Sequence, residues 1–249
     1  MRNEESRARR ALLRLEDGTC YEGRSFGAGG SIAGEVVFTT GMTGYPQALT
    51  DPSFHGQILV CSYPLVGNYG VPGPGRDRWG IPLHFESERI WASGLVVSEA
   101  CRSPSHFASE RGLSDWLAEE GVPGIEGIDT RALTMRLRER GVMRGSIEVE
   151  GAEPGAGAAS EGPAHPVARV SPASPRLYNE GGRPRVALID CGAKNNILRC
   201  LLGRGAEVRV LPWDASLEGL EYDGLFLSNG PGDPKACTKT IATLRRALA

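Results

Sequence analysis

The sequence lacks a long apolar run. Its apolar segments, of which residues 57–63 are among the longest, fall well short of the roughly 20 residues that span a bilayer. The first ten residues carry four arginines and two glutamates, and they lack the apolar core of a secretory signal. We therefore expect a cytoplasmic protein without a membrane anchor, with an organellar location left open.

An excess of one charge is also missing, since 28 Lys and Arg residues face 30 Asp and Glu residues for a formal net charge of −2. This balance gives no indication of a nucleic acid partner. The six cysteines form no CxxC pair, and the four histidines show no HxxxH or HxxE spacing, so we expect no metal site. Without a G-x-x-x-x-G-K-[ST] phosphate loop, we expect no ATP site and no cofactor on this chain.

A nucleophile elbow of the form G-x-S-x-G or G-x-C-x-G is absent from residues 1–249. Cys191 directly follows a predicted strand, as an elbow nucleophile would, but the next residues are Gly192-Ala193-Lys194. A buried, reduced thiol is the favoured interpretation of Cys191, with catalysis as the alternative. We therefore expect no catalytic side chain within 1–249.

Composition divides the chain into parts. From Gly151 to about Gly182 most residues are Gly, Ala, Pro, Ser or Glu, a mixture that buries too little apolar surface to become ordered. We expect a disordered start over 1–10, a domain over 11–150, a linker over 151–182 and a second domain over 183–249. Residues 166–170 could form a short ordered piece within the linker.

Residues 11–150 predict a domain of mixed α and β structure. Strands are expected over 11–15, 35–40, 57–63 and 94–98, with Asp17-Gly18 as a hairpin turn after the first. Helices are expected over 105–120 and 129–140, where apolar residues recur at helical spacing. Asp129 can cap the second helix and Gly141 can end it.

Residues 183–249 predict the opening of a doubly wound α/β domain. The apolar run over 186–191 is typical of a strand buried on both faces, and strands over 207–211 and 224–227 follow it. Helices over 195–202 and 238–249 alternate with the strands, which favours a parallel sheet with right-handed crossovers. Three strands leave a parallel sheet edge uncovered, so we expect the sequence to be a fragment of a longer protein.

The segment Ser228-Asn229-Gly230-Pro231-Gly232-Asp233-Pro234 follows the third of these strands. Ligands of open α/β sheets bind at the carboxyl ends of the strands. Gly230 and Gly232 would let backbone N–H groups approach a substrate, and the following helix adds the positive end of its dipole. Such a loop is suited to holding a carboxylate or stabilising an oxyanion, and a plain tight turn is an equal alternative.

Two segments of the first half combine apolar and turn residues. Residues 40–53 include Asp51-Pro52-Ser53, a turn signal with an available hydroxyl, for which a structural role is favoured. Residues 63–70 are apolar yet rich in turn residues, which could mark a docking surface, with core packing as the alternative.

These segments, in this order, resemble the small chain of carbamoyl phosphate synthetase. The motifs that carry the resemblance are LEDGT (15–19), GEVVF (34–38), MTGY (42–45), LTDPS (49–53), GNYG (67–70), GIDTR (127–131), LT (133–134), DCGAK (190–194), ILR (197–199) and LFLSNGPGDP (225–234). The glycine loop alone would fit any class I glutamine amidotransferase, whereas the first-half domain is specific to this family. The resemblance implies an α/β fold, with a mixed α+β N-terminal small-chain domain followed by the incomplete start of a doubly wound class I glutamine amidotransferase domain.

The resemblance also implies a role in glutamine-dependent carbamoyl phosphate synthesis. In this family, glutamine is hydrolysed through a cysteine thioester. The ammonia passes to a synthetase portion, a large chain or a fused domain, which uses bicarbonate, ATP and Mg²⁺. By motif match, Ser53, Gly230 and Gly232 would bind L-glutamine, and the Gly232 N–H would donate in the oxyanion hole. The family's nucleophile and its His and Glu partners have no match within 1–249, so these residues alone would not cleave glutamine.

Two other functions stay open. A non-catalytic module that docks on and regulates an ammonia-fed synthetase would also lack a nucleophile. Another amidotransferase, serving GMP or anthranilate synthesis, would share the glycine loop but not the domain over 11–150. The sequence does not distinguish an arginine pathway from a pyrimidine pathway.

Overall fold

The computed structural model describes residues 9–152 and 165–248. Their chain divides into two compact units. Within the described residues, unit 1 consists of 9–50, 56–74 and 88–152, and unit 2 consists of 51–55, 75–87 and 165–248. Unit 2 therefore contains two short segments from the first half of the sequence.

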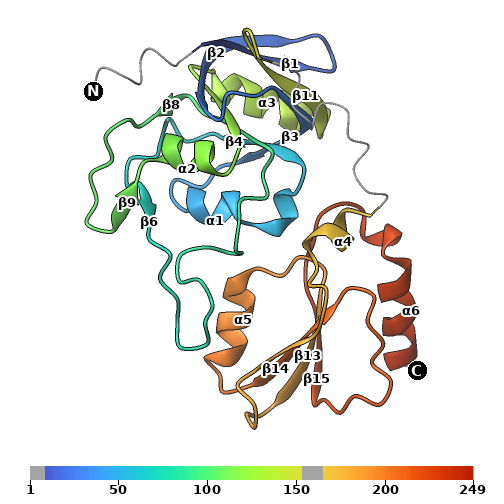
Figure 1. Ribbon diagram of the computed structural model, residues 1–249. Coiled ribbons are helices and arrows are strands. Elements are labelled where there is room, and N and C mark those ends of the chain that lie inside the picture. Colours follow the sequence, from blue (N-terminus) through green and yellow to red (C-terminus); the bar gives the residue numbers. More distant parts are fainter. Residues whose placement is uncertain (1–8, 153–164, 249) are drawn as a thin grey trace. The chain divides into compact units, whose positions relative to one another are not determined.

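A closed barrel of strands forms most of unit 1 (Figure 1). Around the barrel the strands follow the order β1 (Arg10–Leu15), β11 (Met143–Val149), β3 (Ile32–Thr39), β4 (Gln57–Cys61), β7 (Gly94–Val96), β10 (Pro123–Glu126) and β2 (Cys20–Gly27). β3, β4, β7 and β10 pair in parallel, whereas β1, β2 and β11 pair antiparallel. The expected strands and the hairpin at Asp17-Gly18 are present, but closure into a barrel was not predicted.

Three helices and two small sheets complete unit 1. The helices are α1 (Tyr45–Leu49), α2 (Leu113–Glu119) and α3 (Thr130–Arg140); β5 (Leu65–Val66) pairs with β8 (Glu99–Ala100), and β6 (Val71–Pro72) with β9 (Ser109–Arg111). The predicted ends of α3 are confirmed. The Asp129 carboxylate accepts a bond from the Ala132 N–H at 2.9 Å, and Gly141 ends the helix at φ +87°. Leu133 and Leu137 bury α3 against the barrel core.

The helix expected over 105–120 is shorter than predicted. Residues 109–111 form β9 instead, and Gly112 in an extended conformation precedes α2. The apolar residues that carry the helical spacing, Leu113, Trp116 and Leu117, all lie in α2 and are buried. The prediction was therefore wrong for the segment before Gly112, where pairing with β6 overrides the local pattern.

Unit 2 is built on a four-stranded sheet with the order β12 (Arg176–Tyr178), β14 (Glu207–Pro212), β13 (Arg185–Asp190) and β15 (Gly224–Leu227). β13 pairs in parallel with both β14 and β15, as expected for a doubly wound sheet. α5 (Asn195–Leu202) and α6 (Thr238–Ala247) lie on opposite sides of the sheet in Figure 1. Two separate clusters of buried side chains agree with this arrangement, since Leu188 packs with α5 and the adjacent Ile189 packs with the α6 side.

The boundaries of the expected linker need correction. Residues 153–164 lie outside the described residues, but α4 (Pro166–Val170) and β12 are ordered parts of unit 2. β12 adds an antiparallel edge to β14, and Val167 is buried beside Ile189. The second domain thus begins before residue 183, because a few apolar side chains suffice to attach the end of a polar segment to the sheet. At the other end, β1 already includes Arg10, and residues 1–8 lie outside the described residues.

Within unit 2, a segment from the first half of the sequence caps the start of α5. The Glu86 carbonyl accepts the Asn195 N–H at 2.9 Å, and the Glu86 carboxylate accepts the Asn196 N–H at 2.8 Å. An acidic side chain at this end of α5 complements the helix dipole. The segment over 75–87, which belongs to unit 2, therefore helps to orient α5, the helix that follows the loop after β13.

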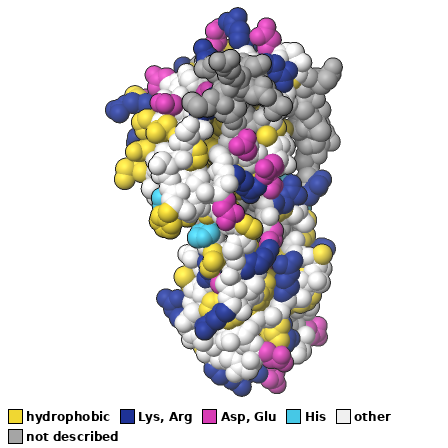
Figure 2. Space-filling model, turned by 60° about the vertical axis from the view of Figure 1, so that its left-hand side comes forward, with side chains coloured by type: hydrophobic (Ala, Val, Ile, Leu, Met, Phe, Trp, Pro, Cys, Tyr) yellow, Lys and Arg dark blue, Asp and Glu magenta, His cyan; other side chains and the backbone are white. Residues whose placement is uncertain are grey.

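Charged side chains of both signs are interspersed over the face seen in Figure 2. Across the described residues, no helix combines the length and apolarity that crossing a bilayer requires. Within the same residues, no group of three or more His, Cys, Asp or Glu side chains could hold a metal ion.

Candidate functional site

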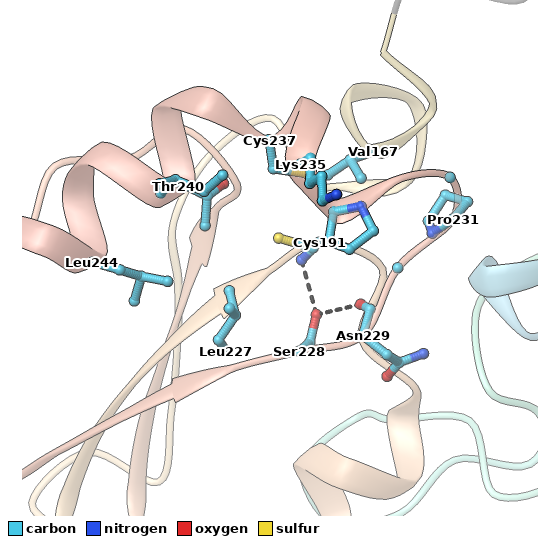
Figure 3. Close-up of a pocket in the computed structure, with 14 residues that line it drawn as sticks. Val167, Cys191, Leu227, Ser228, Asn229, Pro231, Lys235, Cys237, Thr240 and Leu244 are labelled. Atoms are coloured by element: carbon cyan, nitrogen blue, oxygen red, sulfur yellow. Dashed lines mark hydrogen bonds between the residues drawn. The ribbon is translucent and has the colours of Figure 1, made fainter.

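The glycine loop over 228–234 and the loop after β13 meet at the carboxyl edge of the sheet in unit 2. Ser228 joins them, because its Oγ accepts the Cys191 N–H at 2.9 Å and donates to the Asn229 carbonyl at 2.7 Å (Figure 3). The Ser228 N–H extends the hydrogen-bond ladder between β13 and β15 by donating to the Ile189 carbonyl at 3.1 Å. The start of the glycine loop is therefore fixed to the end of β13.

Gly230 lies so close to the end of β13 that no side chain fits there. A Cβ at this position would lie 1.9 Å from the Cys191 carbonyl oxygen. Because this oxygen belongs to the backbone, no change of side-chain rotamer relieves the clash. Gly192 contributes to the same close approach, since its own added Cβ would lie 3.2 Å from the Gly230 Cα. The two loops pack backbone against backbone, which explains why glycine is required at both positions.

Gly232 requires glycine for a different reason. Its φ of +78° lies in the left-handed region, and an added Cβ would stand 2.7 Å from Cγ of Pro166 at the start of α4. After it, the Asp233 carboxylate accepts the Lys235 N–H at 2.9 Å and begins the short 3₁₀ helix η2 (Pro234–Ala236). The chain thus turns sharply between Gly230 and Asp233.

The backbone N–H groups of Gly230 and Gly232 donate to no acceptor among residues 9–152 and 165–248. Gly232 is exposed and Gly230 is partly exposed, so both donors can meet a ligand. Backbone donors held in a fixed loop are suited to a carboxylate or to a developing oxyanion, since they need no reorganisation when charge appears.

Ser53 lies beside the glycine loop because residues 51–55, from the first half of the sequence, belong to unit 2. The Asn229 side-chain amide donates to the Ser53 Oγ at 2.6 Å, across 176 residues of chain. Ser53 follows Asp51 in the short 3₁₀ helix η1 (Pro52–Phe54), where the Asp51 carboxylate accepts the Ser53 N–H at 2.9 Å. The Ser53 hydroxyl is thereby held beside the loop that carries Gly230.

An ion pair stabilises this arrangement. The second Asp51 oxygen lies 2.7 Å from the Lys194 ammonium, and the Asp51 side chain is only 6% exposed, against 40% for Lys194. Asp190 secures the segment before Lys194, since its carboxylate accepts the N–H groups of Gly192 and Ala193, each at 2.7 Å. Burial raises the pKa of Asp190, and these two bonds oppose that rise.

Cys191 does not have the properties of an activated nucleophile. Its side chain is buried, and burial, with a smaller contribution from the neighbouring Cys237 thiol, raises its pKa to about 11. Catalytic thiols instead have lowered pKa values in electropositive surroundings. Burial raises the pKa of Cys237 as well. Both sulfur atoms therefore stay protonated at neutral pH, consistent with buried, reduced thiols.

A pocket of about 440 Å³ lies beside the glycine loop, between β15 and α6 (Figure 3). Its wall is mainly apolar and includes Val167, Cys191, Leu227, Cys237, Ile241 and Leu244. Leu227 is 44% exposed although it belongs to a strand of the sheet. The polar donors of the glycine loop thus lie at the edge of an apolar cavity, a common composition for small-molecule sites.

The structure brings the three predicted glutamine-binding residues into one unit. Ser53 contacts the residue before Gly230, and Gly232 lies two residues further along the same loop. Asp51, Lys194 and Asn229 also take part in this site, although no pattern in the sequence predicts a role for them. Asp51 was recognisable as part of a turn, but no local signal pairs it with Lys194.

Comparison with known proteins defines the class of this site and then the family. Residues 187–249 match the class-I glutamine amidotransferase family, and residues 13–147 match the family described as carbamoyl-phosphate synthase small chain, CPSase domain. The second match covers more than half of the chain. The chain therefore belongs to the carbamoyl-phosphate synthase small-chain family.

Individual relatives agree with this assignment. The chain is 47% identical over 249 residues to the carbamoyl phosphate synthase arginine-specific small chain of Eremothecium gossypii, with 97% of this chain and 62% of that protein covered. It is 44% identical over 244 residues to the protein of the same description from Chaetomium globosum, covering 96% and 53%. It is 46% identical over 240 residues to multifunctional protein CAD of Squalus acanthias, covering 96% and 11%. The chain thus spans less than two thirds of the length of each of these relatives.

Proposed function

We propose that this chain belongs to the glutaminase portion of a glutamine-dependent carbamoyl phosphate synthetase. In this proposal L-glutamine is hydrolysed through a cysteine thioester. The ammonia then passes to a cytoplasmic synthetase portion that uses bicarbonate, ATP and Mg²⁺. ATP and Mg²⁺ bind the synthetase portion and not this chain. The synthetase portion is either a separate large chain or a fused domain, since relatives of both descriptions match.

The observation that carries the proposal is the contact between Ser53 and Asn229 beside two unpaired backbone donors. Glutamine carries a carboxylate, an ammonium and a carboxamide, so its binding needs both donors and acceptors. The Ser53 hydroxyl supplies either, and the N–H groups of Gly230 and Gly232 supply donors. We assign substrate binding to Ser53, Gly230 and Gly232, and donation to the oxyanion to the Gly232 N–H.

The nucleophile is assigned to sequence outside residues 1–249, because no G-x-C-x-G elbow occurs within them. Cys191 is not proposed in its place, since a buried thiol with a pKa of about 11 provides almost no thiolate at neutral pH. Residues 1–249 tested alone are expected to release no ammonia from glutamine.

The test uses the natural full-length protein together with its synthetase portion. Glutamine labelled with ¹⁵N in the side-chain amide is supplied with ATP, Mg²⁺ and bicarbonate, and the label is followed into carbamoyl phosphate. The proposal predicts labelled product. Unlabelled product formed only from added ammonia would instead identify a non-catalytic module of an ammonia-fed synthetase.

A further inference from the structure

The short helix α4 packs against the glycine loop at Gly232. The three atoms nearest to a Cβ added at Gly232 all belong to Pro166, the first residue of this helix. The next residue, Val167, is 2% exposed and lines the apolar pocket beside the loop (Figure 3). α4 lies between the two stretches that match known families, 13–147 and 187–249. Neither family match therefore accounts for this helix.

His165, the residue before α4, contacts the chain that follows the glycine loop. Its Nε2 lies 2.6 Å from the carbonyl oxygen of Ala236, at the end of η2. A carbonyl oxygen only accepts hydrogen bonds, so Nε2 carries the hydrogen and donates it. The consecutive residues His165 and Pro166 thus contact both ends of the segment 232–236.

Trp213, just after β14, holds α4 at both ends. The His165 ring stacks on the Trp213 ring, with centroids 4.3 Å apart and 20° between the planes. At the other end of α4, the Ser171 Oγ accepts the Trp213 N–H at 2.9 Å. The Trp213 carbonyl also accepts the Thr240 hydroxyl of α6 at 2.5 Å. α4 is therefore fixed to the part of unit 2 that surrounds the pocket.

Gly232 depends on this packing for its position. Among the described residues, neither its N–H nor its carbonyl takes part in a hydrogen bond, and its φ of +78° belongs to a region that other residues rarely adopt. A backbone donor stabilises an oxyanion only when it is held at the place where the charge develops. The contacts of His165 and Pro166 supply this restraint from outside the loop.

We propose that His165 is a positioning residue for glutamine hydrolysis. By binding the Ala236 carbonyl and fixing Pro166 against Gly232, it holds the Gly232 N–H where the oxyanion forms. Loss of this restraint should affect the transition state more than the bound substrate, so kcat falls and KM changes little. The inference rests on the proposed function, because it takes the role of the Gly232 N–H from it.

Two substitutions of His165 separate its hydrogen bond from its ring contact. His165→Phe keeps an aromatic ring on Trp213 and removes the donor, whereas His165→Gln keeps an amide donor. Both are measured in the natural full-length protein assembled with its synthetase portion. We expect kcat with glutamine to fall about tenfold or more in His165→Phe, with KM within about twofold of wild type. His165→Gln should keep most of the wild-type kcat, and ammonia-dependent synthesis should be unchanged in both variants.

Ser171→Ala is the matched control for a merely structural role. It removes the acceptor of the Trp213 N–H at the other end of α4 and leaves the contacts of His165 and Pro166 in place. We expect a lower Tm in both Ser171→Ala and His165→Phe, but a lower kcat with glutamine only in His165→Phe. Equal losses of kcat in these two variants, or an unchanged kcat in His165→Phe, would overturn the proposal.

Hydrogen–deuterium exchange of the same proteins supplies a readout that needs no glutamine. The N–H groups of Ala236, Cys237 and Ile241 form hydrogen bonds within η2 and at the start of α6. The peptide covering 234–241 should exchange faster in His165→Phe than in wild type or Ser171→Ala, and unchanged exchange would contradict the proposal. If the glutaminase proposal itself failed, the ¹⁵N experiment would show this in the wild-type protein, whereas the exchange would still report whether His165 holds this segment.

Discussion

The Lys194 ammonium lies 2.7 Å from the carboxylate of Asp51, and the other oxygen of that carboxylate accepts the Ser53 N–H. The ion pair therefore ties the turn that carries Ser53 to the loop that follows β13. Asn229, in the glycine loop, also donates to the Ser53 hydroxyl. The Ser53 side chain is therefore fixed by its own turn, by the loop after β13 and by the glycine loop.

Lys194→Met tests this ion pair. The variant leaves the nearly buried Asp51 carboxylate without its cation, so we expect a loss of about 1–3 kcal/mol in the free energy of unfolding and a several-fold higher KM for glutamine. Lys239→Met is the matched control, because Lys239 pairs with Asp214 at 64% and 37% side-chain exposure and should lose at most about 1 kcal/mol. Chemical denaturation and glutamine kinetics measure the two effects, and equal losses in both variants would contradict the account.

Gly230→Ala tests the close packing of the two loops. The added methyl group would meet the Cys191 carbonyl oxygen, so the glycine loop must move. We expect loss of glutamine-dependent synthesis, with ammonia-dependent synthesis retained, and a stability loss of about 1–3 kcal/mol. Gly224→Ala in β15 provides the control, because an added Cβ there meets nothing within 4 Å. If both variants keep wild-type kinetics with glutamine, the packing argument is wrong.

Gly232→Ala is expected to lower the free energy of unfolding in two ways, through the strained left-handed backbone and through the contact of the new Cβ with Pro166, and the two contributions can be measured separately. Gly219, at φ +73°, has the same left-handed backbone as Gly232 but open space around it, so Gly219→Ala measures the backbone cost of about 1 kcal/mol alone. The additional loss in Gly232→Ala should come from the contact with Pro166. A double variant with Pro166→Ala is expected to recover part of that additional loss, as a double-mutant cycle would show. If the stability losses of Gly232→Ala and Pro166→Ala simply add in the double variant, contact with Pro166 is not the source of the additional loss.

The buried thiol of Cys191 predicts a loss of stability in alkali. Its pKa is raised from 9.0 to about 11, so below pH 9 the folded and unfolded chains are both protonated and the stabilisation is fully present. As pH rises towards 11, only the unfolded chain releases this proton, and up to about 2–3 kcal/mol is lost. Cys191→Ala should flatten the alkaline decline in unfolding free energy, whereas Cys200→Ala, at an exposed position, should not. An unchanged slope in Cys191→Ala would show that burial does not set this pKa.

Local signals in the sequence predict much of unit 2. A continuous apolar run predicted β13, the strands expected over 207–211 and 224–227 correspond to β14 and β15, and the spacing of leucines and isoleucine predicted the bounds of α5 as observed. These features depend on neighbours a few residues apart. β12 was missed because it is a three-residue edge strand whose pairing with β14 comes from across the sheet.

The remainder of the site depends on contacts between distant segments. The local sequence predicts the turn at Asp51-Pro52-Ser53. Its contacts with Lys194 and Asn229, however, join residues more than 140 positions apart, and no periodic pattern in the sequence predicts such contacts. Closure of the barrel in unit 1 also depends on a contact between distant parts of the sequence, since β11 near the end of this domain pairs with β1 at its start. The sequence thus predicted elements and candidate residues, whereas the assembly of the site required the structure.

The most direct test of the central claim is the KM for glutamine of the natural full-length protein carrying Ser53→Ala, measured beside ammonia-dependent synthesis by the same preparation. The account predicts a KM at least tenfold above wild type, because the substrate loses a hydroxyl held by Asn229, and an unchanged rate with ammonia. An unchanged KM for glutamine would contradict the assignment of Ser53, Gly230 and Gly232 to one substrate site.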